Sequence, residues 1–354
     1  MTVYLINIAL IILGYLLLVN SKNFKKGKLY FCIQVSIQWI IISGFRSVEV
    51  GADTWRYKFM FDEALAQSWS EVFQDFKLWF NSAESIKDPG YTIFQKLLQI
   101  FIKDYQIFLI LVATIFIVPM SVWIYKNSEN ALFSYIIFSC LFYSFFAITG
   151  TRQTIVTGIM VFIGFDLLKK KKNGLYYLLL LLLIPIHKSV IALAIVPFIR
   201  KIKISDMAIL VWSILILFGY IFRVELMSVL SSIVGYSEYD KFYEGAGAST
   251  FAILYYLLTL VGLMFNKRIK QMGENMVISF NMVVVGAVLL PLTFINQSAM
   301  RAVQYFSVYL MLYIPQLMSL FVKRDIAIMN VLLISALIIL LILNKPSYTF
   351  FWQV

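Results

Sequence analysis

The stretch GLYYLLLLLLIPIHKSVIALAIVPFI at residues 174–199 decides the fold of this chain. It is apolar except around His187, the one histidine among 354 residues, and basic segments flank it at 169–172 and 200–203. Lysine and arginine favour the cytoplasmic side of membrane proteins, so both flanks lie on the same side. The stretch is too short for two full spans of about 20 residues each. We therefore predict two short helices that meet at Pro185–Lys188 and place His187 in a cavity on the outer side.

The composition predicts an all-α polytopic membrane protein. Hydrophobic residues make up 61% of the chain and charged residues 14%, against about 25% charged residues in soluble proteins. We expect a single integral membrane domain, residues 1–354, with about 12 transmembrane segments that include the broken helical hairpin at His187. The spans are expected near 3–20, 28–45, 105–125, 131–148, 153–168, 174–186, 188–199, 206–223, 250–266, 275–294, 302–322 and 326–343.

The net charge of +12 is an orientation signal. The excess of lysine and arginine lies in short clusters between apolar runs, all assigned to the cytoplasm, while the outer segments are balanced in charge. No nucleic-acid partner is therefore expected, and both termini are placed outside. Cys32 and Cys140 fall within predicted spans, so neither a disulfide framework nor a thiolate metal site is expected.

Two outer loops are large. Residues 46–104 carry aromatic residues at near-helical spacing among charges, a pattern that predicts amphipathic helices lying along the membrane surface. The second loop, residues 224–249, is acidic and aromatic and ends in a glycine- and alanine-rich segment. We expect this loop to lie near an entrance to the outer cavity.

Polar side chains from at least five distant segments fall at the predicted outer face. They are Arg46, Asp53, Arg56, Asp88, Arg152, Gln153, His187, Lys188, Asn296, Gln297 and Arg301. Arg152 and Arg301 each open a predicted span, and a helix start favours an anion through its free N–H groups. The planar guanidinium also binds phosphate oxygens in a bidentate manner. The pair therefore predicts a phosphate site.

Each of these residues also has a purely structural explanation. An arginine at a span end is most often an interface anchor, and a histidine in a turn can simply be hydrogen bonded. Asp53 precedes an amphipathic run and can cap its helix. Asp88 stands before Pro-Gly and can mark a turn. The functional interpretation rests on the gathering of these residues at one face.

The pattern favours chemistry on a lipid-linked diphosphate. No nucleotide-binding loop and no cluster of metal ligands is found in the sequence, so neither a cofactor nor a metal is expected. An outward-facing cationic cavity can stabilise a diphosphate leaving group. His187 would then deprotonate an acceptor hydroxyl, since the ordinary pKa of histidine is about 6.5. An aspartate is the alternative to a histidine as this base.

An ordered set of short motifs resembles the EpsG-like, Wzy-type polysaccharide polymerases over most of the chain. The motifs are Arg46 with Val50–Tyr57, Asp88–Tyr91, Thr151–Gln153, Ile186–Ser189, and Arg301 with Tyr305. That family usually has glutamate where this chain has Asp88, a change that keeps the charge and shortens the side chain.

The resemblance implies a metal-independent glycosyltransferase with a GT-C-like fold in a bacterial inner (plasma) membrane. It would join repeat units of an exopolysaccharide, capsule or O-antigen, carried on a polyprenyl (undecaprenyl) diphosphate, at the periplasmic or extracellular side. Arg152 and Arg301 would hold the donor diphosphate, and His187 would be the base, with Asp53 and Asp88 as further catalytic candidates. The rest of the substrate-binding surface would be Arg46, Arg56, Lys188, Gln153 and Tyr305. The implied partners are lipid-linked oligosaccharides, membrane lipid, and a chain-length regulator and flippase of the same pathway.

Three alternatives stay open. A flippase or exporter of the same lipid-linked saccharide would fit the span count, although transporters carry polar residues near mid-membrane and often in repeated halves. A glycan ligase would use the same donor and differ only in its acceptor. An O-acyltransferase would also use a histidine but has less need for several arginines at one face.

Overall fold

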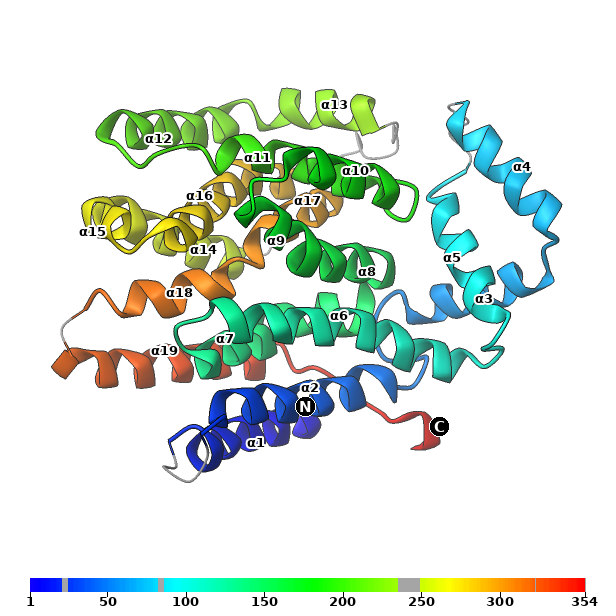
Figure 1. The fold of residues 1–354 in the computed structure, drawn as a ribbon, viewed down its shortest axis with the longest axis horizontal. Coiled ribbons are helices and arrows are strands. Elements are labelled where there is room, and N and C mark those ends of the chain that lie inside the picture. Colours follow the sequence, from blue (N-terminus) through cyan, green and yellow to red (C-terminus); the bar gives the residue numbers. More distant parts are fainter. Residues whose placement is uncertain (21–24, 82–85, 235–248, 322, 354) are drawn as a thin grey trace. The chain divides into compact units, whose positions relative to one another are not determined.

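The computed structural model describes residues 1–20, 25–81, 86–234, 249–321 and 323–353. These residues are mostly helical, and one isolated β-bridge among them joins Arg46 to Phe350. The chain divides into two compact units, unit 1 with Met1–His187 and Phe321–Val354, and unit 2 with Lys188–Leu320. The prediction of an all-α protein is therefore confirmed (Figure 1).

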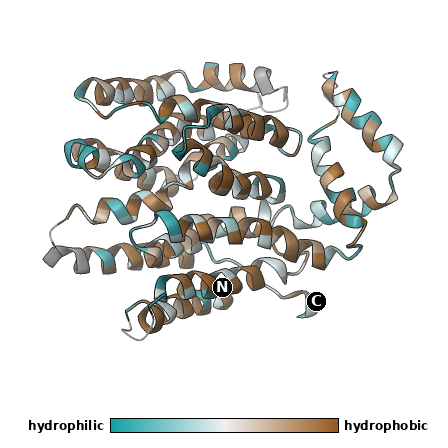
Figure 2. Cartoon of the chain, in the orientation of Figure 1, coloured by the Kyte–Doolittle hydropathy of each residue, from teal (hydrophilic) through white to brown (hydrophobic). Residues whose placement is uncertain are grey.

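Unit 1 is built around α6, which packs against α2 and α8, while α1 packs against α2. Its helices are α1 Thr2–Leu18, α2 Gly27–Gly44, α3 Thr54–Ala66, α4 Trp69–Phe80, α5 Pro89–Gln99, α6 Tyr105–Asn127, α7 Ala131–Ile137, α8 Thr151–Ile159, α9 Phe165–Lys169, α10 Asn173–Leu183 and α19 Lys323–Leu343. Widened π-helical segments extend α7 (η1 Phe138–Phe142 and η2 Ser144–Thr149) and join α8 to α9 (η3 Met160–Gly164). Apolar residues dominate α1, α2, α6 and α10, whereas α3, α4 and α5 are of mixed polarity (Figure 2).

Local signals explain where several of these helices begin. α4 opens with a capping box, in which Ser68 accepts a hydrogen bond from the Glu71 N–H and the Glu71 carboxylate accepts from the Ser68 N–H. These bonds hold the pKa of the Glu71 carboxyl below its usual value. Asp104 caps α6 by accepting from the Ile107 N–H at 2.9 Å. α5 starts with Pro89, whose fixed φ suits the first turn of a helix.

Three helical segments of the described chain are long and apolar enough to cross a membrane: Tyr105–Asn127, Thr151–Lys169 and Glu274–Phe294. A fourth is reached if the pair Asp206–Ile221 and Arg223–Leu230, bent by 83°, counts as one span. The remaining apolar helices are shorter, between 10 and 17 residues. The chain is thus a helical membrane protein, and the expected count of about 12 spans remains a prediction.

The helical run around His187 is interrupted where the sequence predicts. α10 ends at Leu183, residues 184–186 form a turn, and helical structure resumes after His187 as a 3₁₀ segment at Lys188. Pro185 explains the break, because its ring prevents a regular helix from continuing through it.

The segment after α19 crosses the start of the first predicted outer loop, in unit 1. The Ser47 N–H donates to the Thr349 carbonyl at 3.0 Å, and the Phe351 N–H donates to the Phe45 carbonyl at 3.0 Å. The Tyr348 hydroxyl donates to the Ile42 carbonyl at 2.8 Å. This C-terminal segment therefore covers the backbone that carries Arg46.

Unit 2 is organised around α16. Its helical elements are η4 Lys188–Ile195, α11 Val196–Ile199, α12 Asp206–Ile221, α13 Arg223–Val234, α14 Ser249–Met264, α15 Asn266–Gln271, α16 Glu274–Leu289, η6 Leu290–Phe294, η7 Gln297–Ala299, α17 Met300–Ser307 and α18 Leu310–Met318. α16 contacts α12, α14, α17 and α18. Its buried Asn281 donates to the carbonyls of Ile199 and Ile202, at 3.1 and 2.9 Å.

The predicted outer loops have helical parts. α3, α4 and α5 occupy most of residues 46–104, and α5 packs against both α3 and α4. Figure 1 shows these three helices in blue to cyan, beside the other helices of unit 1. In the second predicted loop, 224–249, the first part belongs to α13, and residues 235–248 lie outside the described residues.

Candidate active site

The turn before α5 brings Asp88 to the turn that contains Pro185. The Gly90 N–H donates to the Pro185 carbonyl at 2.9 Å, and the Tyr91 N–H donates to the Asp88 carbonyl at 3.0 Å. Asp88 itself has φ +55°, a left-handed conformation, which costs an L-residue roughly 1–2 kcal/mol. Such local strain persists only where the surrounding contacts hold it, and it is enriched at functional sites.

Three candidate residues of unit 1 meet at one carboxylate oxygen. Arg152 donates from Nη1 to Asp88 Oδ2 at 2.7 Å. His187 Nδ1 lies 3.2 Å from the same oxygen. Asp88 is only 2% exposed and His187 5%, while the Arg152 side chain is 15% exposed. We call these three residues the Asp–Arg–His cluster.

Because the cluster is buried, the stability of each charged member depends on the presence of the others. Removing one member of a buried ion pair costs roughly 3–5 kcal/mol, because the other charge is left without compensation. The Arg152 guanidinium supplies the positive charge that the Asp88 carboxylate needs at this depth. The cluster therefore depends on three chain segments: the turn before α5, the first turn of α8 and the turn after α10.

Two tyrosines complete the surroundings of Arg152. Its guanidinium lies 5.8 Å from the centre of the Tyr57 ring, a cation–π contact. The Tyr57 and Tyr91 rings meet edge to face with centroids 5.8 Å apart. Burial raises the pKa of Tyr91 well above its usual value, and the charges of Arg152 and Arg46 act in the opposite direction.

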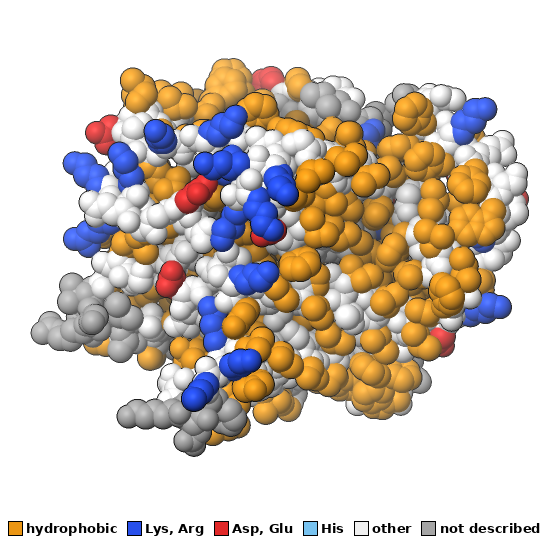
Figure 3. Space-filling view, in the orientation of Figure 1, with side chains coloured by type: hydrophobic (Ala, Val, Ile, Leu, Met, Phe, Trp, Pro, Cys, Tyr) orange, Lys and Arg blue, Asp and Glu red, His pale blue; other side chains and the backbone are white. Residues whose placement is uncertain are grey.

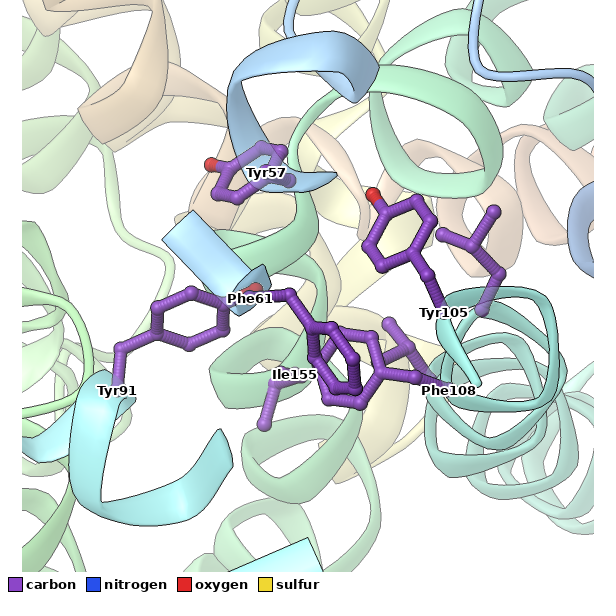
Figure 4. Close-up of a cluster of buried hydrophobic side chains, with 8 residues drawn as sticks. Tyr57, Phe61, Tyr91, Tyr105, Phe108 and Ile155 are labelled. Atoms are coloured by element: carbon purple, nitrogen blue, oxygen red, sulfur yellow. The ribbon is translucent and has the colours of Figure 1, made fainter. Parts of the chain in front are cut away.

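Both tyrosines belong to an aromatic core, and this explains how α3 and α5 are held. The core contains Tyr57, Phe61, Tyr91, Tyr105, Phe108, Leu109, Val112 and Ile155 (Figure 4). The rings of Phe61 and Phe108 lie 4.9 Å apart, which ties α3 to α6. Sequence reasoning did not single out Tyr57 or Tyr91 as site residues, although both end motifs that carried the family resemblance.

The chemistry of the cluster centres on the imidazole. A carboxylate beside Nδ1 favours the tautomer with the proton on Nδ1, which leaves Nε2 as the basic nitrogen. This arrangement is the one in which a histidine acts as a general base oriented by an acid. Arg152, bound to the carboxylate by Nη1, can still present its remaining donors to an anion, because a guanidinium has five N–H groups.

The other candidates in unit 1 are found on α3, on α8 and just after α2. Arg46 is buried, and its Nη1 donates to the Ser43 carbonyl. Asp53 occupies the cap position of α3 without a side-chain capping bond and is half-buried. Arg56 is exposed on α3, and Gln153 is buried next to Arg152 on α8.

The remaining candidates belong to unit 2. Lys188 is half-buried at the start of η4, and Arg301 is half-buried in the first turn of α17. Tyr305 is buried, and its hydroxyl lies 3.2 Å from Ser189 Oγ. Asn296 caps the short helix η7, with its side chain accepting from the Ser298 N–H at 2.8 Å.

Within the described part of the chain, no group of three or more His, Cys, Asp or Glu side chains is placed to hold a metal ion. Cys32 and Cys140 are buried free thiols. The polar residues that do gather, in the Asp–Arg–His cluster, are of the types that bind anions and transfer protons.

We predict that Gly90→Ala lowers activity by about tenfold or more, because small displacements of a catalytic group have large effects on rate. A Cβ at Gly90 would lie 2.6 Å from the Pro185 Cβ and 2.9 Å from its carbonyl oxygen. The turn must then move away, and Asp88 moves with it. Activity and yield of the purified variant provide the measurement.

Gly174→Ala is the matched control, because a Cβ there meets nothing within 4 Å. This variant is expected to keep wild-type activity. Equal activities for the two variants would show that the contact between Gly90 and Pro185 does not position Asp88.

Fold and site together define an all-helical membrane protein with a buried Asp–Arg–His cluster. The family model of the EpsG family matches residues 28–351, so the chain belongs to the EpsG family. This confirms the family indicated by the motifs, and it suggests a polysaccharide-polymerase type of function. No curated protein and no solved structure matches the chain.

Proposed function

We propose that this protein joins oligosaccharide repeat units carried on polyprenyl diphosphate at the outer face of the membrane. The single observation that carries the proposal is the convergence of Arg152 and His187 on the buried Asp88 carboxylate. Membership of the EpsG family supports the same class of reaction. The cluster supplies an oriented base beside a cationic group, the two functions that glycosyl transfer from a diphosphate requires.

In the proposed reaction His187 Nε2 accepts the proton of an acceptor sugar hydroxyl. The acceptor oxygen forms the new glycosidic bond, while the bond between the donor sugar and the diphosphate breaks. The diphosphate leaves with additional negative charge, which Arg152 stabilises through donors that Asp88 does not occupy. Asp88 acts as a positioning residue, because it contacts both groups and is itself almost fully buried.

Further residues are proposed to bind substrate, as the family resemblance implies. In unit 2, Arg301 is proposed to bind the donor diphosphate, supported by its position in the first turn of α17. The further substrate-binding candidates are Arg46, Arg56, Lys188, Gln153 and Tyr305. The reaction needs neither a metal nor a nucleotide in this proposal, since arginines neutralise the leaving group.

The test uses purified protein in lipid vesicles with a polyprenyl-diphosphate oligosaccharide, EDTA and no nucleotide. A ladder of regularly spaced glycans on a gel is the expected result. Movement of labelled lipid between leaflets without a ladder would replace the polymerase by a flippase. Transfer to a different acceptor without a ladder would indicate a ligase.

The orientation is tested with single introduced cysteines in unit 1. Ala52 lies in the loop before α3 and Lys172 before α10, and both are exposed. A membrane-impermeant maleimide is expected to label Ala52→Cys in intact cells and Lys172→Cys only after permeabilisation. The native Cys32 and Cys140 are 2% and 3% exposed, so they provide a low background. The reverse labelling pattern would place the Asp–Arg–His cluster on the cytoplasmic side.

A further inference from the structure

A second polar site lies in unit 1 at the far ends of the helices that carry the aromatic core. α6 runs from Tyr105 to Asn127, and the segment from α8 to α9 runs beside it in the same direction. Near their starts the two segments pack together, and Phe108 and Ile155 belong to the same core cluster. Near their ends Trp123 and Phe165 meet with ring centroids 5.8 Å apart. An open pocket of about 190 Å³ lies between the C-terminal end of α6 and the C-terminal end of the α8–α9 segment.

The pocket combines cations with aromatic walls. Its lining includes Lys126 and Lys169, with Asn127 between them. Lys126 Nζ lies 5.7 Å from the centre of the Phe162 ring. Lys169 Nζ lies 5.9 Å from the centre of the Phe165 ring and donates to Asn127 Oδ1 at 3.2 Å. Both ammonium groups are therefore held at the pocket by weak contacts that an anion can supplement or replace.

The pocket also includes a carboxylate, which does not cancel its charge. Asp166 lines the wall, and its Oδ2 pairs with Lys170 Nζ at 2.6 Å. Helix C-termini carry a partial negative charge of about half a unit each, which two lysines exceed. The pocket therefore keeps a net positive charge and favours an anionic ligand.

Apolar side chains continue from the pocket along the helix surface. Phe162 and Ile163 line the pocket and are 41% and 44% exposed, and Val118 on α6 is 41% exposed. In a membrane protein such exposed apolar surface contacts lipid chains. Figure 3 shows that many apolar side chains are exposed, as well as lysine and arginine side chains. A ligand here would therefore need an anionic head next to an apolar tail.

We propose that this pocket binds the phosphate-bearing head group of an anionic phospholipid. The phosphate contacts Lys126 and Lys169, the glycerol carbons fill the pocket against Trp123, and an acyl chain follows Phe162 and Ile163. Basic pockets between membrane helices recognise lipid head groups in this way. The site lies at the opposite helix ends from the Asp–Arg–His cluster and does not depend on the proposed function.

The test measures lipid bound to the purified protein by native mass spectrometry. The probes are dioleoyl-phosphatidylglycerol and dioleoyl-phosphatidylcholine, which share their chains and differ in net charge. Wild-type protein is expected to retain phosphatidylglycerol preferentially. Lys126→Gln combined with Lys169→Gln is expected to reduce that binding about tenfold, the effect of losing a charge-assisted hydrogen bond.

A matched control removes the same charge elsewhere in unit 1. Lys58→Gln combined with Lys77→Gln changes α3 and α4, where Lys58 pairs with Asp62 and Lys77 is exposed. This pair is expected to bind phosphatidylglycerol like the wild type. Equal losses in both double variants would show that binding follows net charge alone, and the proposed site would be wrong.

Two further measurements secure the result if the glutamine variant does not fold. Lys126→Arg combined with Lys169→Arg keeps both charges, and this variant is expected to retain the lipid. If the wild-type protein shows no preference for phosphatidylglycerol, the proposal is wrong. Inorganic phosphate and glycerol 3-phosphate are added as competitors. Displacement of the lipid by either one at equal concentration would assign the pocket to a small phosphate instead of a lipid.

Discussion

Replacing His187 by glutamine is expected to lower the rate of glycan joining by about 1000-fold, within the range that general-base catalysis contributes. Glutamine is polar and of similar size, so it can keep a hydrogen bond to Asp88, but it cannot accept a proton at neutral pH. The initial rate of ladder formation from a polyprenyl-diphosphate oligosaccharide measures the effect. A rate within a few-fold of wild type would show that His187 is only a hydrogen-bonded residue of the turn.

A structural role for His187 is separated from a chemical one by rescue. His187→Ala leaves a space where the imidazole ring was, next to the Asp88 carboxylate. Added imidazole is expected to restore part of the activity in this variant, because it supplies the missing base. It is not expected to affect Gly90→Ala, in which the base is present and displaced. Absence of rescue, with correctly folded His187→Ala protein, would shift the base role to Asp53.

Local sequence signals were sufficient to predict the interruption of the helix at His187. Proline ends a helix for steric reasons that depend on its immediate neighbours only, whereas the number of membrane crossings inferred from the basic flanks remains a prediction. The same local logic predicted that the residues of 46–104 would include amphipathic helices, where α3, α4 and α5 now lie. Fold class followed from composition, since long apolar runs have few alternatives to helix in a membrane.

The sequence singled out Asp88, Arg152 and His187 as candidates but did not indicate how they contact one another. Asp88 was predicted as a catalytic candidate and Arg152 as a diphosphate ligand, whereas the structure joins them in one ion pair. Asp88 and His187 lie 99 positions apart in the chain, and no local pattern reports such a contact. Sequence periodicity does not predict the hydrogen bond between Gly90 and Pro185 either, because it forms between two turns that are distant in the chain.

The surroundings of Arg46 illustrate the same limit. Its motif and its place at the end of α2 predicted a surface group for substrate. In the structure a bridge to Phe350 brings the C-terminal segment across this position, and Arg46 is 3% exposed. Burial lowers the pKa of its guanidinium. A contact between residues so distant in the chain arises from tertiary packing, which composition and spacing do not encode.

Arg152→Lys is expected to lower activity by about 100-fold, comparable with the loss of one transition-state donor. Lysine keeps the positive charge and can still pair with Asp88, but its single ammonium cannot bind the carboxylate and a phosphate through separate N–H groups of a planar fork. The control is Arg268→Lys, which changes an exposed arginine on α15 of unit 2. Wild-type activity in Arg152→Lys would reduce Arg152 to a partner of Asp88.

The coupling between Arg152 and Asp88 distinguishes positioning from independent catalysis. Asp88→Asn keeps the size of the side chain and removes its charge, so the imidazole loses its orienting carboxylate and Arg152 loses its ion pair. Arg152 Nη1 and Asp88 Oδ2 are 2.7 Å apart. Substitutions of residues in such direct contact usually have non-additive effects on free energy. The double variant Arg152→Lys with Asp88→Asn is therefore expected to be about as active as the less active of the two single variants. If the two losses instead multiply, the residues act separately, and Asp88 would contact substrate itself instead of positioning the groups that do.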